Sequence, residues 1–518
     1  MAAPQTPVRL PVYTSSLSTA ELVPQPRGQD LLRLLGLRWF FRWKYARLLL
    51  QLPLLLLALL VIIDGLTGRQ LAPRNVATTA VWLHYRGLVV IALAMLGNAF
   101  CAACPLMLTR GLSRRLETRL AKKWRWPAAL KNKYLVTLLL LGFFFSYEYF
   151  DLWASPWLTA WLAIGYFVGA LAVDTLFPAG TFCKYLCPLG NFNFLYASAS
   201  PSQIAAIDHD VCRRCVGKPC LHGRESYAAA AQLPVQARAT FIPLSEVRNA
   251  NGSGYFPGCE TQLFVPTMQS NMDCTLCFNC LRACPYDNVA LKLRAPTWEW
   301  SHAPWRKQRL SLALLAVLMT AWAMLNAIAM IGPWYSMAEW TAGLLHTRSE
   351  ALILGLFFAI ISLLGVALPL FTACLADRLG GLQVSWRSSL QRWAYVLLAL
   401  GFGFWTAHYL FHFFTGALSI IPVLEHFFWY RGAAIEPNWR LAQLIPNRWL
   451  FSIGATVTLG YTAAAIYVAA RIALRDFGLR WYIALMPMLT YAMWFAALAL
   501  WVLAQPMEMR GTIFGPTF

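Results

Sequence analysis

One run of cysteines carries the clearest chemistry in the chain. Cys274, Cys277 and Cys280 are separated by two-residue gaps, and Cys284 is followed at once by Pro285. This spacing lets three close thiolates hold three irons of one 4Fe-4S cube while the fourth thiolate serves a neighbouring cluster. Pro285 supports the division, because proline disfavours helix at the preceding residue and turns the Cys284 thiolate elsewhere. The run predicts iron–sulfur ligation, with a zinc site or idle thiols as the alternative.

A second, incomplete run upstream would supply the neighbouring cluster. The residues between its last cysteine and Cys259, 221–258, include a Gly-, Ser- and Asn-containing stretch typical of a loop. A motif split by a surface insertion is the simplest account. We predict two [4Fe-4S] clusters, the first held by Cys212, Cys215, Cys220 and Cys284, and the second by Cys274, Cys277, Cys280 and Cys259. A spare Cys259 thiol, with water or another group as the ligand, is the alternative.

The composition assigns these cysteines to a membrane protein. Only 13% of the 518 residues are charged and the mean hydropathy is +0.52, whereas a soluble chain carries about 25% charged residues. Uncharged runs of about twenty residues are long enough to cross the hydrocarbon core of a bilayer. Hydropathy predicts nine transmembrane helices, near residues 46–64, 86–104, 134–152, 156–177, 309–332, 351–374, 393–414, 449–470 and 483–504.

Lysine and arginine set the expected orientation. The net charge of +21 is explained by basic residues that hold cytoplasmic loops inside, so no nucleic-acid partner is needed. The tail before the first span and the loop after the second are rich in these residues. We therefore expect a prokaryotic cytoplasmic (inner) membrane protein whose N-terminus and large central segment lie in the cytoplasm and whose C-terminus lies outside.

The predicted fold is an all-α polytopic membrane protein with an inserted cytoplasmic α+β two-cluster ferredoxin-type domain. Residues 31–45, apolar except for basic residues, are expected to form a helix in the membrane interface. The predicted divisions are a cytoplasmic tail with this helix (1–45), a four-helix membrane domain (46–199), the ferredoxin-like domain (200–306, with the insertion 221–258) and a five-helix membrane domain (307–518).

Four further cysteines are predicted at one membrane depth. Cys101 and Cys104 end the second predicted span, Cys183 and Cys187 follow the fourth, and each pair is followed by a helix-stopping proline. Four such thiols could hold a third Fe-S cluster or a metal such as zinc or copper. They could instead form redox-active dithiol pairs, or serve packing alone.

Three histidines suggest another redox site. His408 and His412 are four residues apart and share one helical face, and His84 is expected at a comparable depth near the outer surface. Together they could ligate a haem b iron or a metal ion, or hydrogen-bond a quinone carbonyl. The alternative is that His408 and His412 belong to an aromatic belt at the membrane interface.

At these cysteines the chain resembles the membrane polyferredoxins of the NapH, NosR and CcoG type. That family pairs transmembrane helices bearing Cys-Pro motifs with a cytoplasmic two-cluster ferredoxin, and the similarity covers residues 45–300. The family's usual C-x-x-x-C-P motif is matched at 183–188, whereas 101–105 is one residue shorter and Glu260 rather than proline follows Cys259. The resemblance implies an electron-carrying membrane subunit without fixing its pathway.

The expected function is therefore electron transfer within an oxidoreductase complex rather than stand-alone catalysis. The chain would relay electrons between a quinone pool or another membrane partner and a cytoplasmic redox protein, embedded in lipid as one subunit of several. The alternative is a redox or copper-handling assembly factor, or a redox sensor, that uses the membrane thiols. A redox-coupled transporter is disfavoured because charged residues are scarce deep within the predicted spans.

Overall fold

The computed structural model describes residues 25–34, 36–117, 124–215, 217–225, 255–302 and 310–507, and it is mostly helical. The chain forms two compact units. The first, called here the cysteine unit, comprises Ser202–Arg294 and the N-terminal segment up to Leu49. The second, the helical unit, comprises Leu50–Pro201 and Ala295–Phe518. Most of the predicted insertion, residues 226–254, lies outside the described residues.

The cysteine unit is built from two short sheets and short helices. Its outer strands, β1 (Ser202–Ala206) and β4 (Val289–Leu293), pair antiparallel and so bring the two ends of the central segment together. A second antiparallel pair joins β2 (Arg224–Glu225) to β3 (Tyr255–Phe256). The helices that carry or flank cysteines are α10 (His209–Arg214), α11 (Pro219–His222) and α14 (Asn279–Ala283).

The predicted interfacial helix over 31–45 is divided into two short pieces. A 3-10 turn, η2 (Leu31–Arg33), and α1 (Leu37–Arg42) are separated by Gly36, whose φ of +70° is the left-handed conformation that favours glycine. The arginines of α1 are used inside the cysteine unit, where Arg38 and Arg42 both form ion pairs with Asp287. The N-terminal segment therefore belongs to this folded unit.

The helical unit has the character of a multi-pass membrane protein. Seven helical stretches of the described residues are long and apolar enough to cross a bilayer, fewer than the nine predicted. The helix α7 (Tyr134–Tyr149) has only 16 residues, and α21 (Leu450–Phe477) and α22 (Trp481–Ala504) are joined by a 3-10 turn into one helical run. The other six stretches are α2 (Ala46–Thr67), Val76–Met95, α8 (Pro156–Leu176), α16 (Leu310–Ile328), α18 (Glu350–Leu379) and α19 (Trp386–Gly416).

The second predicted span, 86–104, is wrong at both ends. The helix runs from Val76 to Met95 through α3 (Val76–Thr78), the π-helical η4 (Thr79–Tyr85) and α4 (Arg86–Met95). It begins early because the Asn75 side chain caps it, accepting the Ala77 N–H at 2.9 Å. It ends early at Gly97, whose φ is +74°. Arg86 therefore lies within the span and not at its end.

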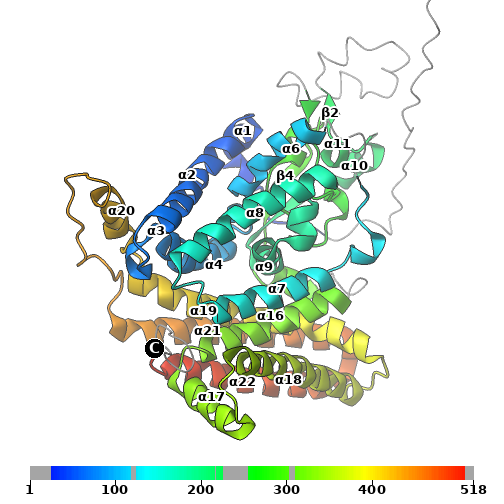
Figure 1. Cartoon of the computed structure of the whole chain (residues 1–518). Coiled ribbons are helices and arrows are strands. Elements are labelled where there is room, and N and C mark those ends of the chain that lie inside the picture. Colours follow the sequence, from blue (N-terminus) through cyan, green and yellow to red (C-terminus); the bar gives the residue numbers. More distant parts are fainter. Residues whose placement is uncertain are drawn as a thin grey trace, which may run out of the picture. The chain divides into compact units, whose positions relative to one another are not determined.

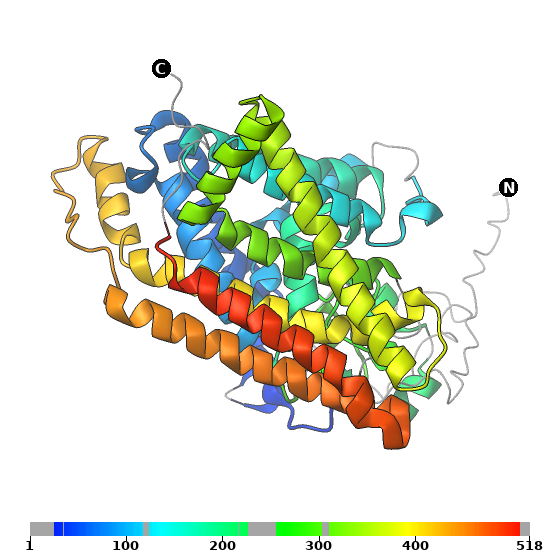
Figure 2. The same cartoon turned by 90° about the horizontal axis from the view of Figure 1, so that it is seen from below.

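Helices α16 and α19 form the centre of the helical unit. Of their most apolar windows, 78% and 89% of residues are buried, against 22% for α8 and α18. Helix α19 packs against α4, α16, α18 and α21, and α21 runs beside α22 (Figures 1 and 2). The peripheral helices expose large apolar side chains such as Leu56, Leu363 and Phe371, which suits contact with lipid.

Candidate functional site

The first group of thiols lines one cavity in the cysteine unit. Its members are Cys212, Cys215, Cys220 and Cys284. Burial, followed by the nearby Cys284 charge, raises the pKa of Cys212 and of Cys215 to about 12, and the same two causes raise the pKa of Cys220. Thiols with such pKa values stay protonated at neutral pH unless a cation stabilises the thiolate.

The second group contains Cys274, Cys277, Cys280 and Cys259. Burial raises the pKa of the first three, and a charge on Cys259 raises the pKa of each further. The structure thus brings Cys259 to the 274–280 run and Cys284 to the 212–220 run. Each run of three cysteines meets the fourth cysteine of the other run.

The two cysteine loops share a backbone conformation. Lys218 and Phe278, each two residues before the third cysteine of its run, have φ values of 46° and 55° and start the short helices α11 and α14. The following hydrogen bonds match as well, since the N–H of Cys259 donates to Cys220 O and that of Cys284 donates to Cys280 O, both at 3.0 Å. Cys259 therefore holds the place after α11 that Cys284 holds after α14.

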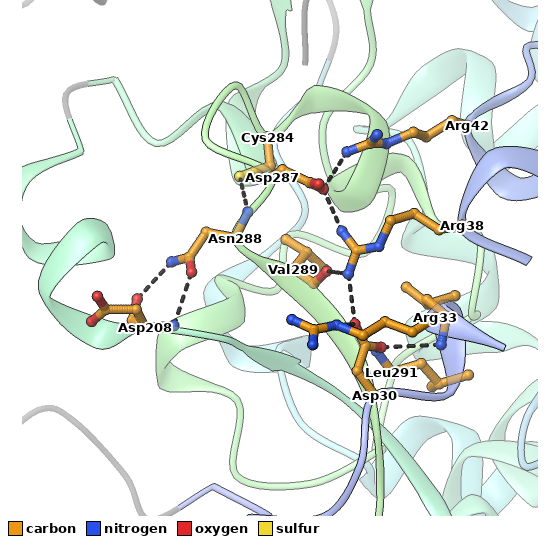
Figure 3. Close-up of polar contacts among 11 residues, drawn as sticks. Asp30, Arg33, Arg38, Arg42, Asp208, Cys284, Asp287, Asn288, Val289 and Leu291 are labelled. Carbon is orange, nitrogen blue, oxygen red and sulfur yellow. Dashed lines mark hydrogen bonds and ion pairs between the residues drawn. The ribbon is translucent and has the colours of Figure 1, made fainter. Parts of the chain in front are cut away.

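Asn288 connects two thiols of the first group, and Figure 3 shows its contacts with Cys284 and Asp208. Its backbone N–H donates to Cys284 Sγ at 3.3 Å and its side-chain amide donates to Cys212 Sγ at 3.1 Å. The Asn288 side-chain oxygen accepts the Asp208 N–H at 2.8 Å, which fixes the amide orientation. Sequence reasoning missed this residue, although its place four residues after Cys284 was a usable signal.

Two arginines and two carboxylates surround the residues after Cys284 (Figure 3). Asp287 pairs with Arg38 and Arg42, and Arg38 also contacts Asp30 at 2.6 Å. Asp30 accepts the backbone N–H of Leu291 in β4 at 3.1 Å. The N-terminal segment therefore neutralises the Asp287 carboxylate that lies beside Cys284.

Glu260 places a carboxylate beside the second thiol group. It pairs with Arg47, and both side chains are mostly buried. The Glu260 charge raises the pKa of Cys277, after the larger effect of burial, while the Arg47 charge lowers it. Glu260, which follows Cys259 where the family usually has proline, thus brings a buried ion pair close to the Cys277 thiol.

The four membrane cysteines also come together, in the helical unit. Cys101 lies close enough to interact electrostatically with Cys104 and Cys183, and Cys187 with all three. Cys187 caps α9 (Pro188–Tyr196) by accepting the Gly190 N–H at 3.1 Å. The first pair lies in and just after the short helix α5 (Ala99–Ala102). The second pair lies in and just after the π-turn η7 (Phe182–Leu186).

Soft and charged groups lie against these thiols. Cys183 Sγ is 3.5 Å from Met107 Sδ and 3.9 Å from a nitrogen of Arg110. Arg110 pairs with Asp174 at 2.8 Å, and both side chains are buried. Asn193 donates to Cys101 Sγ at 3.6 Å.

No group of three or more His, Cys, Asp or Glu side chains in the described part of the chain is placed to hold a single metal ion. This differs from the compact tetrahedron of a structural zinc site. Around a 4Fe-4S cube each thiolate binds a different iron, so the sulfurs need not converge on one point. No known family model, curated protein or solved structure matches the chain.

His408 and His412 lie together, and His84 is engaged by two backbone oxygens. His408 is fully buried in α19, with its ring 4.8 Å from that of His412. The ring nitrogens of His408 and the Nε2 of His412 are buried without a hydrogen-bond partner. Both ring nitrogens of His84 contact backbone oxygens, those of Thr79 at 2.9 Å and Ala417 at 3.1 Å.

Proposed function

We propose that the chain is a membrane-bound iron–sulfur electron-transfer subunit with two [4Fe-4S] clusters in the cysteine unit. The observation that carries the proposal is the exchange of Cys259 and Cys284 between the two cysteine runs. Three ligands from one run and a fourth from the other are what two neighbouring cubes require. The resemblance to membrane polyferredoxins points the same way.

The clusters would supply one-electron transfer, and the protein would tune their potentials. Asn288 donates hydrogen bonds to two thiol sulfurs of the first group. Arg38 and Arg42 neutralise Asp287 near Cys284, where Arg224 adds a positive charge. Arg47 offsets the Glu260 charge near Cys277. Hydrogen bonds to sulfur and nearby positive charge both favour the reduced, more negative cluster.

The proposed role is a relay between a quinone pool or another membrane partner and a cytoplasmic redox protein. The cysteine unit and the N-terminus would face the cytoplasm and the C-terminus the outside of a prokaryotic inner membrane, as the basic residues indicate. The seven apolar helical stretches support association with lipid. In this proposal the chain acts as one subunit of a larger oxidoreductase complex.

Iron counting on anaerobically purified, full-length protein tests the proposal. Two cubes give about eight irons and eight sulfides per chain, and a third cube on the membrane thiols gives about twelve. Electron paramagnetic resonance of the reduced sample should show two interacting 4Fe-4S signals. Four or fewer irons, or zinc in their place, would contradict the two-cluster assignment. Cys374→Ala, a change outside both groups, is the control and should leave the iron count unchanged.

A second function is favoured by the contact between Cys183 and Met107. Thiolates and a thioether select soft ions such as copper(I), so the membrane thiols could serve a copper-handling or redox-sensing role. Copper(I) titration distinguishes the two functions. Binding that is lost in Met107→Leu and Cys183→Ser, in protein with no iron, would favour this second function.

A further inference from the structure

A cavity of about 460 Å³ lies at one end of the helical unit. It is enclosed by η3 (Ala72–Arg74), the start of the Val76–Met95 helix, and the C-terminal ends of α7, α16 and α19. Its walls are mainly apolar and aromatic, with Trp82, Tyr147 and Trp153 among them. A cavity of this size and polarity is typical of a site for a small organic ligand.

The few polar groups in this cavity are buried and ionisable. Arg86 is 7% exposed and its guanidinium lies over the rings of Trp82, Tyr147 and Tyr409, at 5.1, 4.4 and 5.3 Å. Glu148 is 3% exposed. A buried cation and a buried carboxylate are costly to keep charged, and such groups cluster at functional sites.

Unsatisfied polar atoms accompany this pair of charges. Asn326 donates to Glu148 at 3.3 Å, while its own amide oxygen is buried without a partner. The Nε2 of His412, which also lines the cavity, is likewise buried without a partner. Buried polar atoms of this kind normally find a partner, so the cavity offers both donors and acceptors to an occupant.

These features select a neutral, ring-shaped occupant. Arg86 and Glu148 balance each other in charge, which disfavours a small anion or cation. The aromatic walls suit a flat ring, and the polar groups can donate to carbonyl oxygens and accept from hydroxyl groups. A quinone presents carbonyls, its quinol presents hydroxyls, and both are neutral.

A second cavity lies between this one and the membrane thiols. This second cavity shares Trp82 and Arg86 with the first and reaches Pro188, the residue after Cys187. Tyr85, next to Arg86, lies within electrostatic range of Cys101 and Cys187. An occupant beside Arg86 would therefore lie next to Tyr85, which is within electrostatic range of this thiol group.

We propose that this cavity binds the head group of a quinone or quinol, held by Arg86, Glu148 and His412. The choice of a redox-active ring rests on the electron-transfer function proposed above, but binding itself needs no turnover. The site differs from the His84, His408 and His412 group predicted from sequence, because only His412 reaches the cavity lining.

Binding is measured on full-length protein in quinone-free nanodiscs, with the fluorescent quinone analogue 2-heptyl-4-hydroxyquinoline N-oxide as the probe. Ubiquinone-1 and a short-chain menaquinone are the competitors, so the two arms distinguish benzoquinone from naphthoquinone. We expect saturable quenching that one competitor reverses. Glu148→Gln should raise the Kd about tenfold, in line with the loss of one charged hydrogen bond.

Ala442→Trp is the second variant, because it fills the cavity while leaving both charges in place. This variant should abolish the saturable probe quenching that a quinone competitor reverses. Glu339→Gln and Arg448→Gln, at exposed positions of the helical unit, are matched controls that should bind like the wild type. Unchanged Kd values in all variants, or quenching no greater than in empty nanodiscs, would overturn the proposal.

The iron content of the same samples separates the two proposals. Full iron without probe binding contradicts the quinone site alone, whereas probe binding without iron contradicts the electron-transfer function alone. A phospholipid that native mass spectrometry finds in the wild type, that is lost in Ala442→Trp and that the probe does not displace, would also overturn the choice of a quinone.

Discussion

The backbone N–H of Cys259 donates to the carbonyl oxygen of Cys220 at 3.0 Å, although a long insertion separates the two residues in the chain. Gly258 permits the approach, because a Cβ there would collide with the Leu221 carbonyl. The insertion thus leaves and returns beside α11, between the paired strands β2 and β3. Cys259 is therefore held beside Cys220 although the insertion separates them in sequence.

Deleting the insertion should therefore spare the thiol groups. Residues 226–254 are replaced by Asn-Gly, which closes a two-residue hairpin between Glu225 and Tyr255, a pair already in register. Iron content and the paramagnetic resonance spectrum should match those of the full chain. Loss of more than half of the iron would show that the insertion itself supplies a ligand or a necessary contact.

Removing either fourth ligand should damage the cluster held by the other run of cysteines. Cys284→Ala removes a thiol from the 212–220 group, and Cys259→Ala removes one from the 274–280 group. Each variant should lose about half of the iron, or yield a 3Fe form, with a different resonance signal lost in each case. Loss of the same signal in both variants would show that the assignment of the two groups is wrong.

Asn288→Asp should lower one midpoint potential selectively. The substitution keeps the oxygen that accepts from Asp208 but replaces the amide that donates to Cys212 Sγ with a carboxylate. Losing one hydrogen bond to sulfur corresponds to a shift on the order of 60 mV for a one-electron couple, and the negative charge of the new carboxylate lowers the potential further. Redox titration of both signals measures it, with the 274–280 cluster as the internal control. Equal shifts in both clusters would contradict a local effect.

Sequence reasoning located the cysteines because their meaning lies in local spacing. The two-residue gaps of 274–280 and a nearby proline are visible without any knowledge of tertiary structure. Hydropathy likewise located most membrane helices. It misjudged the second span because helix ends depend on caps, here Asn75 and Gly97, rather than on apolar content.

The features that the sequence did not predict arise from contacts between distant segments. From the sequence, Arg38 and Arg42 are expected at the membrane interface. In the fold they form ion pairs with Asp287, which is distant in sequence. Arg86 and Glu148 look like ends of spans, and only the folded helical unit gathers them around one cavity. Such pairings depend on tertiary packing and leave no pattern in either segment alone.

The pair of Arg47 and Glu260 should set the potential of the second cluster. Arg47→Gln leaves the Glu260 carboxylate uncompensated near Cys277, so the midpoint potential should fall, by an amount on the order of 50 mV for a partly screened charge. Glu260→Gln should raise it, and the double variant should lie near the wild type. A double variant that keeps the full shift of either single variant would contradict an electrostatic effect of this pair on the cluster.

The buried pair of Arg110 and Asp174 should hold the membrane thiol group in place. The side chains are 6% and 4% exposed and 2.8 Å apart, so Arg110→Leu leaves a lone buried carboxylate and should cost about 3–5 kcal/mol of stability. Asp174→Leu alone should cost a similar amount. The double variant should recover most of the loss, since two apolar residues leave no buried charge.

The apparent Tm in detergent measures stability, and thiol labelling of Cys183 reports access to the membrane thiol group. Because Arg110 also contacts Cys183, faster labelling in the double variant despite a recovered Tm would separate the role of Arg110 in shielding this thiol from its role in folding. A Tm loss in the double variant equal to the sum of the two single losses would show that the two side chains act independently.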